Sequence, residues 1–246
     1  MLDQTLEAMA GKPHERLEFW TDLLNEVNAE NVAEVGVFKG DFAEAVLRQC
    51  AGVKSYAMID PWRNLPDWNK PANLSQINFD EVYDTAMNKT SFAKDKITVH
   101  RDTTKSCSAK IKDRSLDFVY IDGDHTLRGI TIDLLLMYQK VKNGGLIGGD
   151  DFTRSIWQHE GKFDPTFVCP FAIYFAEAMN VPVYSLPNSQ FLIVKDEKSG
   201  FKFTDLDGRY ANLSINDMIK KPNMIVAAAR KFLPAPVKAQ LRRLVR

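Results

Sequence analysis

The fold of this chain is decided by residues 31–40, which have the sequence Asn31-Val32-Ala33-Glu34-Val35-Gly36-Val37-Phe38-Lys39-Gly40. An apolar strand runs here into a turn between two glycines, and residues 42–48 continue with the apolar spacing of a helix. A second apolar strand follows at residues 54–60 and ends at Asp60. This order of strand, loop, helix and strand predicts a parallel sheet in a protein of the α/β class.

The turn from Gly36 to Gly40 has the features of a ligand-binding turn. Its glycines let the backbone approach a ligand closely, and the helix that follows presents free N–H groups and the positive end of its dipole. The spacing is G-x-x-x-G with no third glycine, whereas dinucleotide binding requires G-x-G-x-x-G, so NAD is disfavoured. Asp60 can accept two hydrogen bonds from a ribose diol. Each feature alone also suits a plain turn or a helix cap, but together they predict nucleoside binding.

Strands and helices alternate along the rest of the chain. We expect strands at 97–100, 116–122, 145–150, 182–186 and 190–195, and helices at 78–94, 105–111, 127–141 and 169–179, with Asn143-Gly144-Gly145 ending the third of these helices. The turn Pro187-Asn188-Ser189 joins the last two strands in a hairpin, which makes the sheet mixed. The Pro-, Trp- and Asn-rich residues 61–77 predict a long loop that covers the site.

Composition and charge exclude several classes of protein. The 246 residues are 45% hydrophobic, and 32 basic residues balance 32 acidic ones, so no net charge attracts nucleic acid or an anionic membrane. The first 30 residues carry seven acidic side chains and no continuous apolar run, so we expect a cytoplasmic protein without a signal or membrane span. Cys50, Cys107 and Cys169 are widely separated, which predicts reduced, buried thiols rather than disulfides or a zinc site.

Two further motifs carry a family resemblance. Residues 117–125 are Asp-Phe-Val-Tyr-Ile-Asp-Gly-Asp-His and residues 144–151 are Gly-Gly-Leu-Ile-Gly-Gly-Asp-Asp. With the turn and Asp60 they resemble the class I S-adenosylmethionine-dependent methyltransferases over residues 31–195, and most of all the bacterial sugar O-methyltransferases of macrolide and aminocoumarin antibiotic pathways, of methyltransferase family 24 type. The resemblance implies a Rossmann-like fold, with a seven-stranded, mostly parallel sheet that ends in an antiparallel hairpin and has helices on both faces.

The resemblance also implies roles for individual residues. It makes Asp122, Asp150 and Asp151 ligands of Mg²⁺, and it places Glu34 and Gly36 beside the methionine part of S-adenosylmethionine. The full set expected to bind the cofactor comprises Glu34, Gly36, Phe38, Gly40, Asp60, Trp62, Asp102, Thr103 and Asp122. Within this set, Asp102 and Thr103 follow the strand 97–100 toward the adenine, and Trp62 could stack on the base or simply pack.

The residues themselves favour a hard cation near Asp122, Asp150 and Asp151. These carboxylates follow two strands that should be neighbours, at the edge where open α/β sheets bind ligands, and they would repel one another without a cation. Oxygen ligands suit Mg²⁺, Mn²⁺ or Ca²⁺ better than zinc. The alternative is that Asp150 and Asp151 cap a turn and that Asp122 only holds the amino group of the cofactor.

The reaction implied by the resemblance is attack of a substrate oxygen on the sulfonium methyl group. Positioning then supplies most of the catalysis, and the hydroxyl proton must leave. We expect Asp122, Asp124 and His125 to be catalytic, with His125 or Asp124 as the general base, although Asp124 could instead cap the helix 127–141. Residues expected near the substrate are Asn64, Trp68, Asn69, Arg154, Trp157 and His159.

We therefore predict an O-methyltransferase that acts on a hydroxyl of a sugar or another small molecule. Its parts are a helical extension or lid at 1–30, the cofactor-binding catalytic domain at 31–200 and a basic helical extension at 201–246, which we expect to make contacts in a homo-oligomer rather than with membrane. The alternatives are a metal-independent methyltransferase with another small-molecule acceptor, an oxidoreductase that binds NAD or a nucleotide sugar, and a non-catalytic binding protein.

Overall fold

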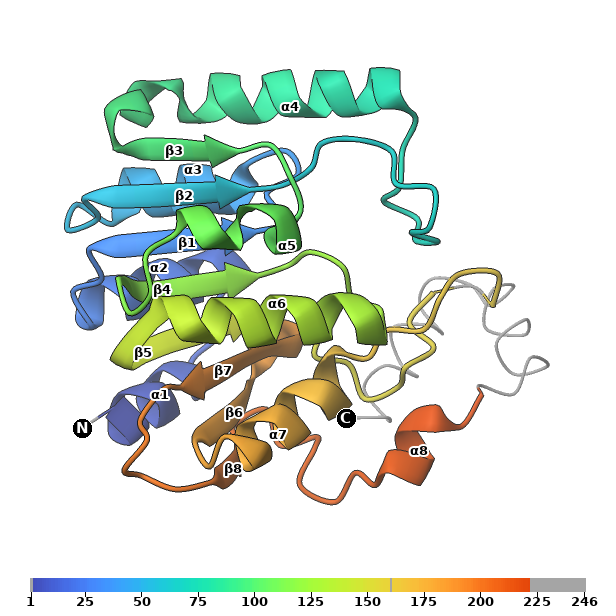
Figure 1. Cartoon of the computed structure of the whole chain (residues 1–246). Coiled ribbons are helices and arrows are strands. Elements are labelled where there is room, and N and C mark those ends of the chain that lie inside the picture. Colours follow the sequence, from blue (N-terminus) through green and yellow to red (C-terminus); the bar gives the residue numbers. More distant parts are fainter. Residues whose placement is uncertain (1, 160, 222–246) are drawn as a thin grey trace.

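The computed structural model describes residues 2–159 and 161–221, which form a central sheet between two layers of helices (Figure 1). In this part of the chain the sheet has eight strands in the order β3-β2-β1-β4-β5-β7-β6-β8. The strands are β1 (Asn31–Val35), β2 (Ser55–Ile59), β3 (Ile97–His100), β4 (Leu116–Ile121), β5 (Val141–Gly149), β6 (Pro182–Leu186), β7 (Gln190–Val194) and β8 (Lys202–Asp205). The mixed sheet with a terminal hairpin is confirmed, because β1 to β5 are parallel and β7 runs antiparallel to both β5 and β6.

One strand was not predicted. β8 pairs in parallel with β6, so the sheet has eight strands where seven were expected. The strand is short, and its residues are only partly buried or exposed. Its sequence therefore has no clear alternation of apolar and polar residues from which a strand could be predicted. It lies in the segment for which we expected only a helical extension.

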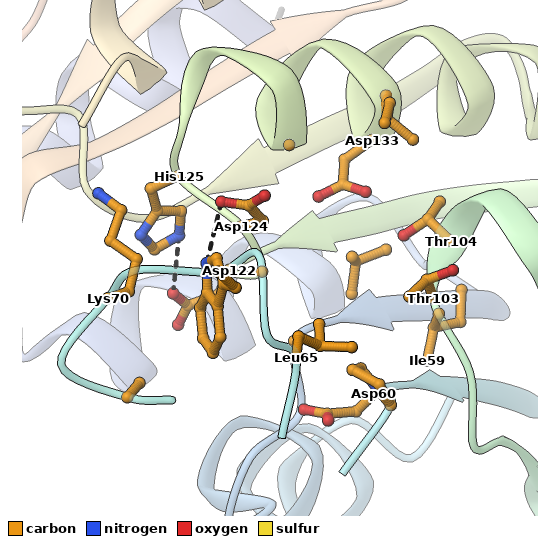
Figure 2. A pocket seen from close by; sticks show the side chains of 18 of the residues that line it. Ile59, Asp60, Leu65, Lys70, Thr103, Thr104, Asp122, Asp124, His125 and Asp133 are labelled. Carbon is orange, nitrogen blue, oxygen red and sulfur yellow. Dashed lines mark hydrogen bonds and ion pairs between the residues drawn. The ribbon is translucent and has the colours of Figure 1, made fainter. Parts of the chain in front are cut away.

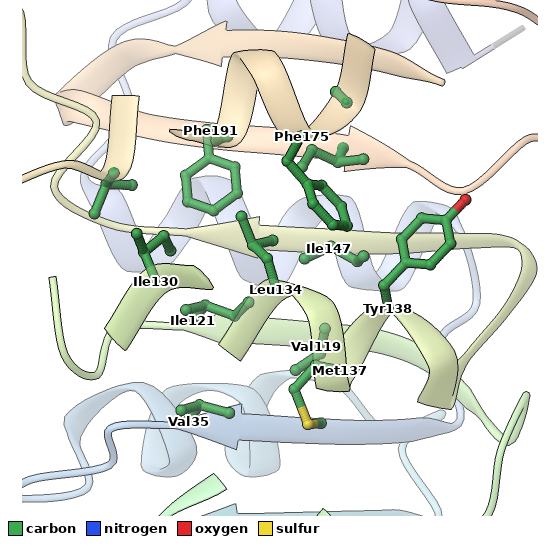
Figure 3. Close-up of a cluster of buried hydrophobic side chains, with 14 of the residues drawn as sticks. Val35, Val119, Ile121, Ile130, Leu134, Met137, Tyr138, Ile147, Phe175 and Phe191 are labelled. Carbon is green, nitrogen blue, oxygen red and sulfur yellow. The ribbon is translucent and has the colours of Figure 1, made fainter. Parts of the chain in front are cut away.

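Helices cover both faces of the sheet, as expected (Figure 1). They are α1 (Leu2–Ala10), α2 (Arg16–Glu26), α3 (Asp41–Gln49), α4 (Gln76–Thr90), α5 (Thr104–Cys107), α6 (Leu127–Lys140), α7 (Val168–Ala178) and α8 (Ile215–Ile219), with short 3₁₀ turns η1 (Ser91–Lys96), η2 (Ser108–Lys110) and η3 (Pro187–Ser189). Side chains of α5, α6 and α7 share one buried cluster, part of which Figure 3 shows, and those of α1, α2 and α3 share the other.

The central strand β4 explains why residues 116–122 are almost continuously apolar. Val119 and Ile121 belong to the cluster under α6 and α7, whereas Phe118 and Tyr120 belong to the cluster under α2 and α3. All four are fully or almost fully buried, as expected of a strand with a helical layer on each side. The carboxyl ends of β4 and β5 are neighbours, since Ile121 is in register with Gly149.

The glycine pair Gly144-Gly145 does not end a helix, which corrects our prediction. Helix α6 stops at Lys140, Val141 already has extended backbone, and the glycines lie within β5. The cause is pairing with the segment after β7, because Gly144 N donates to Lys195 O at 2.6 Å and Lys195 N donates to Gly145 O at 2.9 Å. A cap was expected from the local sequence, but tertiary hydrogen bonds hold the same residues in a strand.

The N-terminal segment forms the two helices α1 and α2, and Trp20 anchors α2 on the sheet. The indole of Trp20 is fully buried, and its Nε1 donates to Gln190 Oε1 at 2.8 Å. Gly148 of β5 makes room for the ring, since a Cβ there would lie 2.3 Å from the Trp20 Cη2 atom. The first turn of α2 is thereby held at the carboxyl ends of β4 and β5.

Several remaining expectations concern the chain as a whole. None of the helices in residues 2–159 and 161–221 is long and apolar enough to cross a membrane. Cys50, Cys107 and Cys169 are buried free thiols, as expected. Most of the basic tail, residues 222–246, lies outside the described residues, and 201–221 form β8 and α8.

Candidate active site

A cavity of about 570 Å³ lies at the carboxyl ends of the parallel strands. Most of the predicted site residues line it: Gly36, Phe38, Asp60, Asp102, Thr103, Asp122, Asp124, His125 and Asp151. In Figure 2, Asp60 and Thr103 lie on one side of the pocket, and Asp122, Asp124 and His125 lie on the other. The strand ends that were predicted to form the site therefore meet at this cavity. Four predicted residues do not line the cavity, namely Glu34, Gly40, Trp62 and Asp150.

The glycine turn brings the ends of β1 and β4 into direct contact. Gly36 has a φ of 86°, and a Cβ at this position would lie 2.0 Å from the carbonyl oxygen of Asp122. Phe38, two residues on, has a φ of 49°, a left-handed conformation that costs a side-chain-bearing residue free energy. The turn therefore needs glycine first, and its N–H groups are held by the protein, since Gly36 N donates to Ile59 O at 2.9 Å and Gly40 N donates to Val37 O at 2.9 Å.

Asp60 organises the same turn from the end of β2. Its Oδ2 accepts from Phe38 N at 2.9 Å, and its Oδ1 accepts from Trp62 N at 2.7 Å. Burial raises the pKa of this carboxyl, and the backbone donors oppose the rise. Each oxygen keeps a lone pair for a further donor, so a ribose diol can still bind as predicted.

Three of the predicted cofactor residues lie beneath the cavity wall instead of in it. The carboxyl of Glu34 is buried against the hydroxyl of Tyr56, which donates to it at 2.7 Å. Trp62 is buried edge-to-face on Tyr83, and its Nε1 donates to Phe38 O at 2.8 Å. Gly40 is the residue before α3, with a φ of 78°. These residues support the turn from behind.

Asp133 of α6 lines the cavity and was not foreseen. It is almost completely buried, and desolvation raises its pKa to about 7 although Thr104 stabilises its charge by a hydrogen bond. No pattern in the sequence distinguishes Asp133, which lies in a helix whose buried positions are mostly apolar but also include Lys140. Asp102, by contrast, lies where it was expected, and its Oδ1 accepts from Thr103 N at 2.8 Å and from Arg63 Nη2 at 3.1 Å.

The predicted loop runs from the end of β2 to Gln76 and lines the cavity with residues 61, 63, 65–68 and 70–72. It is fastened to the segment before α7 by Lys70, which is almost fully buried. The Lys70 Nζ donates to Asp164 O at 2.9 Å, to Pro165 O at 3.1 Å and to Thr166 Oγ1 at 3.0 Å. This fixes the loop over the site as a cover.

Two of the residues expected near the substrate line the cavity, Trp68 and His159. The Trp68 Nε1 donates to Asp124 Oδ1 at 3.0 Å, which ties the loop to the end of β4. Burial lowers the pKa of His159, so its imidazole is neutral at pH 7. Asn64, Asn69, Arg154 and Trp157 do not line the cavity.

The three carboxylates predicted as metal ligands do converge, but each faces a cationic side chain. The Arg16 Nη1 contacts Asp122 Oδ2 at 3.3 Å and forms a short ion pair with Asp150 Oδ2. The His125 Nδ1 lies 2.6 Å from Asp151 Oδ2, and its Nε2 lies 3.4 Å from Asp122 Oδ1 without hydrogen-bond geometry. Arg16 was not singled out in the sequence, because nothing near it distinguishes it from a surface arginine.

The remaining carboxylate oxygens are also engaged. Asp150 Oδ1 accepts from Gln190 Nε2 at 2.6 Å and from the Asp151 amide at 2.7 Å, and Asp151 Oδ1 accepts from Gln158 Nε2. Each oxygen of Asp150 and Asp151 and Oδ2 of Asp122 thus faces a nitrogen donor, whereas Asp122 Oδ1 has only the distant His125 Nε2 at 3.4 Å. Within the described residues no group of three or more His, Cys, Asp or Glu side chains is arranged to hold a metal ion. In this arrangement the carboxylates do not fit Mg²⁺, which needs several oxygen ligands.

Asp124 and His125, the two predicted general bases, also interact with other side chains of the protein. Asp124 accepts from Trp68 Nε1, from Thr126 N at 2.9 Å and from Thr126 Oγ1 at 3.0 Å, while Thr126 itself caps α6. Burial lowers the pKa of His125, but Asp122 and Asp151 outweigh burial and raise it to about 10. His125 is therefore cationic at neutral pH and orients the carboxylates on either side of it.

The cavity lining does not support the oxidoreductase alternative, for which a catalytic Tyr-x-x-x-Lys pair would be expected. Tyr138 and Lys142 have this spacing, but neither lines the cavity. Lys142 pairs with Asp117 at 2.7 Å, and the ring of Tyr138 packs on Phe175.

Comparison with known families decides the class. A family model described as a methyltransferase domain matches residues 33–152, which run from β1 through the glycine turn, Asp60 and the Asp122–His125 segment to the end of β5. Residues 33–152 thus match a methyltransferase domain, and the chain is a methyltransferase. The enzyme's predicted class and fold are thereby confirmed. No curated protein sequence matches the chain.

Solved structures of methyltransferases share the fold of this enzyme at low sequence identity. A putative caffeoyl-CoA O-methyltransferase from Staphylococcus aureus superposes with a TM-score of 0.55 at 13% identity, covering 78% of this chain and 88% of that one. The O-methyltransferase TomG from Streptomyces achromogenes, involved in tomaymycin synthesis and solved in complex with SAM, gives 0.52 at 11% identity, covering 79% and 89%. An O-methyltransferase from Bacillus cereus in complex with SAH gives 0.51 at 16% identity, covering 79% and 90%.

Proposed function

We propose that this methyltransferase moves the methyl group of S-adenosylmethionine to a hydroxyl of a small molecule, with a sugar as the acceptor class. One observation carries the proposal: a single cavity joins the turn of Gly36 and Asp60 to the cluster of Asp124, His125 and Asp151. The first part suits a nucleoside with a charged amino-acid end, and the second suits a polar acceptor. The neighbours solved with SAM or SAH support the choice of donor.

In the proposed reaction the acceptor oxygen attacks the methyl carbon, the carbon–sulfur bond breaks and the hydroxyl proton leaves. The chain's contribution is positioning, because the loop held by Lys70 covers the cavity and excludes water. Since Asp124 and His125 are already engaged, we assign proton acceptance to the neutral imidazole of His159 at the same wall. His125 and Asp124 then orient Asp151 and Trp68.

Mg²⁺ assistance, the cytoplasmic location and a homo-oligomer remain predictions. A resident Mg²⁺ would supply charge stabilisation to the acceptor oxygen, but the carboxylates present face Arg16 and His125, so no step above runs through an ion. The division into an N-terminal extension or lid, a catalytic domain and a C-terminal extension is likewise proposed.

Two measurements test the proposal. Calorimetric titration with S-adenosylhomocysteine should show binding that Asp60→Ala weakens by roughly 10- to 100-fold, since two buried backbone donors and the ribose lose their acceptor. Asp102→Ala, at a more exposed carboxylate, is the control and should cost less. Transfer of labelled methyl groups to a panel of sugars, amines and carboxylic acids, each with and without EDTA, identifies the acceptor. Labelling of amines alone, or NAD binding in place of S-adenosylhomocysteine, would refute the proposal.

A further inference from the structure

The carboxylate cluster at the ends of β4 and β5 already contains a cation that belongs to the chain. Arg16 is the first residue of α2, and its guanidinium reaches the Asp122 and Asp150 side chains, which lie more than a hundred positions away along the chain. The Arg16 side chain is 34% exposed, and those of Asp122 and Asp150 are 28% and 18% exposed. These three side chains are therefore partly buried but still accessible to solvent. A positive charge thus lies where opposing carboxylates need one.

The position of Arg16 is costly to the helix, which shows that its partners hold it there. A basic residue in the first turn of a helix opposes the positive end of the helix dipole. The only local compensation is the capping pair of Glu15 and Glu18. The carboxylates of Asp122 and Asp150 supply the rest, and together with Tyr120 they raise the Arg16 pKa above its usual range although burial lowers it.

The surrounding packing fixes where this arginine can go. Trp20, one helical turn after Arg16, is locked over Gly148 and donates to Gln190. The same Gln190 donates to Asp150 at 2.6 Å and accepts from the Tyr120 hydroxyl at 2.7 Å. The helix and the carboxylate are therefore anchored to one amide, so Arg16 cannot withdraw without disturbing a buried network.

We propose that Arg16 is the resident cation of the Asp122–Asp150 pair, that it positions these two carboxylates at the ends of β4 and β5, and that any divalent ion there must displace it. The charge of the cluster is then set by the N-terminal helix rather than by free metal. This goes beyond the proposed function, since it concerns the cluster and not the identity of donor or acceptor.

Mn²⁺ binding to the cofactor-free enzyme tests this, because loss of the free-ion electron paramagnetic resonance signal reports bound Mn²⁺ without any turnover. Arg16→Gln keeps a polar side chain but removes the charge, so it should bind one Mn²⁺ about tenfold or more tightly than wild type. Mn²⁺ should also raise the melting temperature of this variant and leave that of wild type unchanged. Arg48→Gln is the matched control, since it removes an exposed ion pair with Glu44 and should behave as wild type.

The test measures only the affinity for Mn²⁺, so its result does not depend on whether the enzyme transfers a methyl group to the proposed acceptor. If wild type binds one Mn²⁺ and Arg16→Gln binds it no more tightly, or if neither binds, the proposal is overturned. Should Arg16→Gln not fold, Arg16→Lys carries the test, because a single ammonium cannot bridge two carboxylates as a guanidinium does and Mn²⁺ affinity should rise to an intermediate value.

Discussion

The two halves of the cavity are built in different ways. The cofactor half, at the ends of β1 and β2, is made of backbone: a glycine turn whose N–H groups are held by Asp60 within 22 positions of chain. The proposed acceptor half, at the ends of β4 and β5, is made of side-chain charges, and the nearby ion pair of Arg16 with Asp150, neither of which lines the cavity, spans 134 positions. The first half depends on local conformation, and the second depends on the assembled fold.

The largest effect that could break this comparison is expected from Gly36→Ala. The new Cβ would lie 2.0 Å from the Asp122 carbonyl, so β1 and β4 would have to separate, and S-adenosylhomocysteine binding should be lost together with much of the stability. Gly144→Ala is the matched control: its φ is also left-handed, 81° against 86°, but nothing lies within 4 Å of its Cβ. It should cost only about 1–2 kcal/mol, the price of the backbone conformation. Equal melting temperatures for the two variants would contradict the contact argument.

The contrast between the halves also explains what the sequence could predict. The turn, Asp60 and the adjacent strands follow from periodicity and glycine spacing, which are local, and all of these elements are where they were expected. Asp122 and Asp151 were placed correctly because parallel strands end at one edge. Their partners Arg16 and Gln190 were missed, since tertiary packing alone brings them there. Gly144 was wrongly predicted to end a helix for the same reason, whereas the Trp62 ring packs on Tyr83, which was one of the two alternatives given for it.

A smaller effect, confined to the acceptor half, is expected from Lys70→Met. Methionine keeps the length of the side chain but loses three hydrogen bonds to residues 164–166, which should cost roughly 1–3 kcal/mol and loosen the cover. The KM for the acceptor should rise, while the Kd for S-adenosylhomocysteine should change much less. Lys105→Met, at an exposed lysine on the cofactor side of the same cavity, serves as control. A larger change in cofactor affinity than in acceptor KM would show that the halves are not separable.

The remaining expected effect is a pH dependence contributed by Asp133, which lines the same cavity. Its folded pKa of about 7 lies above the ordinary value of 3.8, so the fold prefers the protonated form. The contribution of Asp133 to the free energy of unfolding is therefore fully present below pH 4. It is lost as the pH rises toward 7, where the buried carboxyl ionises near Asp124 and His125. Asp133→Asn should lose less stability than wild type between pH 5 and pH 8 in urea unfolding. Parallel pH profiles would instead mean that Asp133 is already ionised in the fold.

The packing of Trp20 on Gly148 has a consequence for the order in which parts of the chain fold. The helix that carries Trp20 is synthesised well before Gly148, which makes room for its ring, and 170 positions before Gln190, whose amide oxygen accepts its N–H. Contacts between such distant segments close late, because the intervening chain must first lose its freedom. The nascent chain can thus form its glycine turn long before Arg16 reaches its carboxylates, and a ribosome-stalled fragment ending before β5 should leave the N-terminal helix undocked.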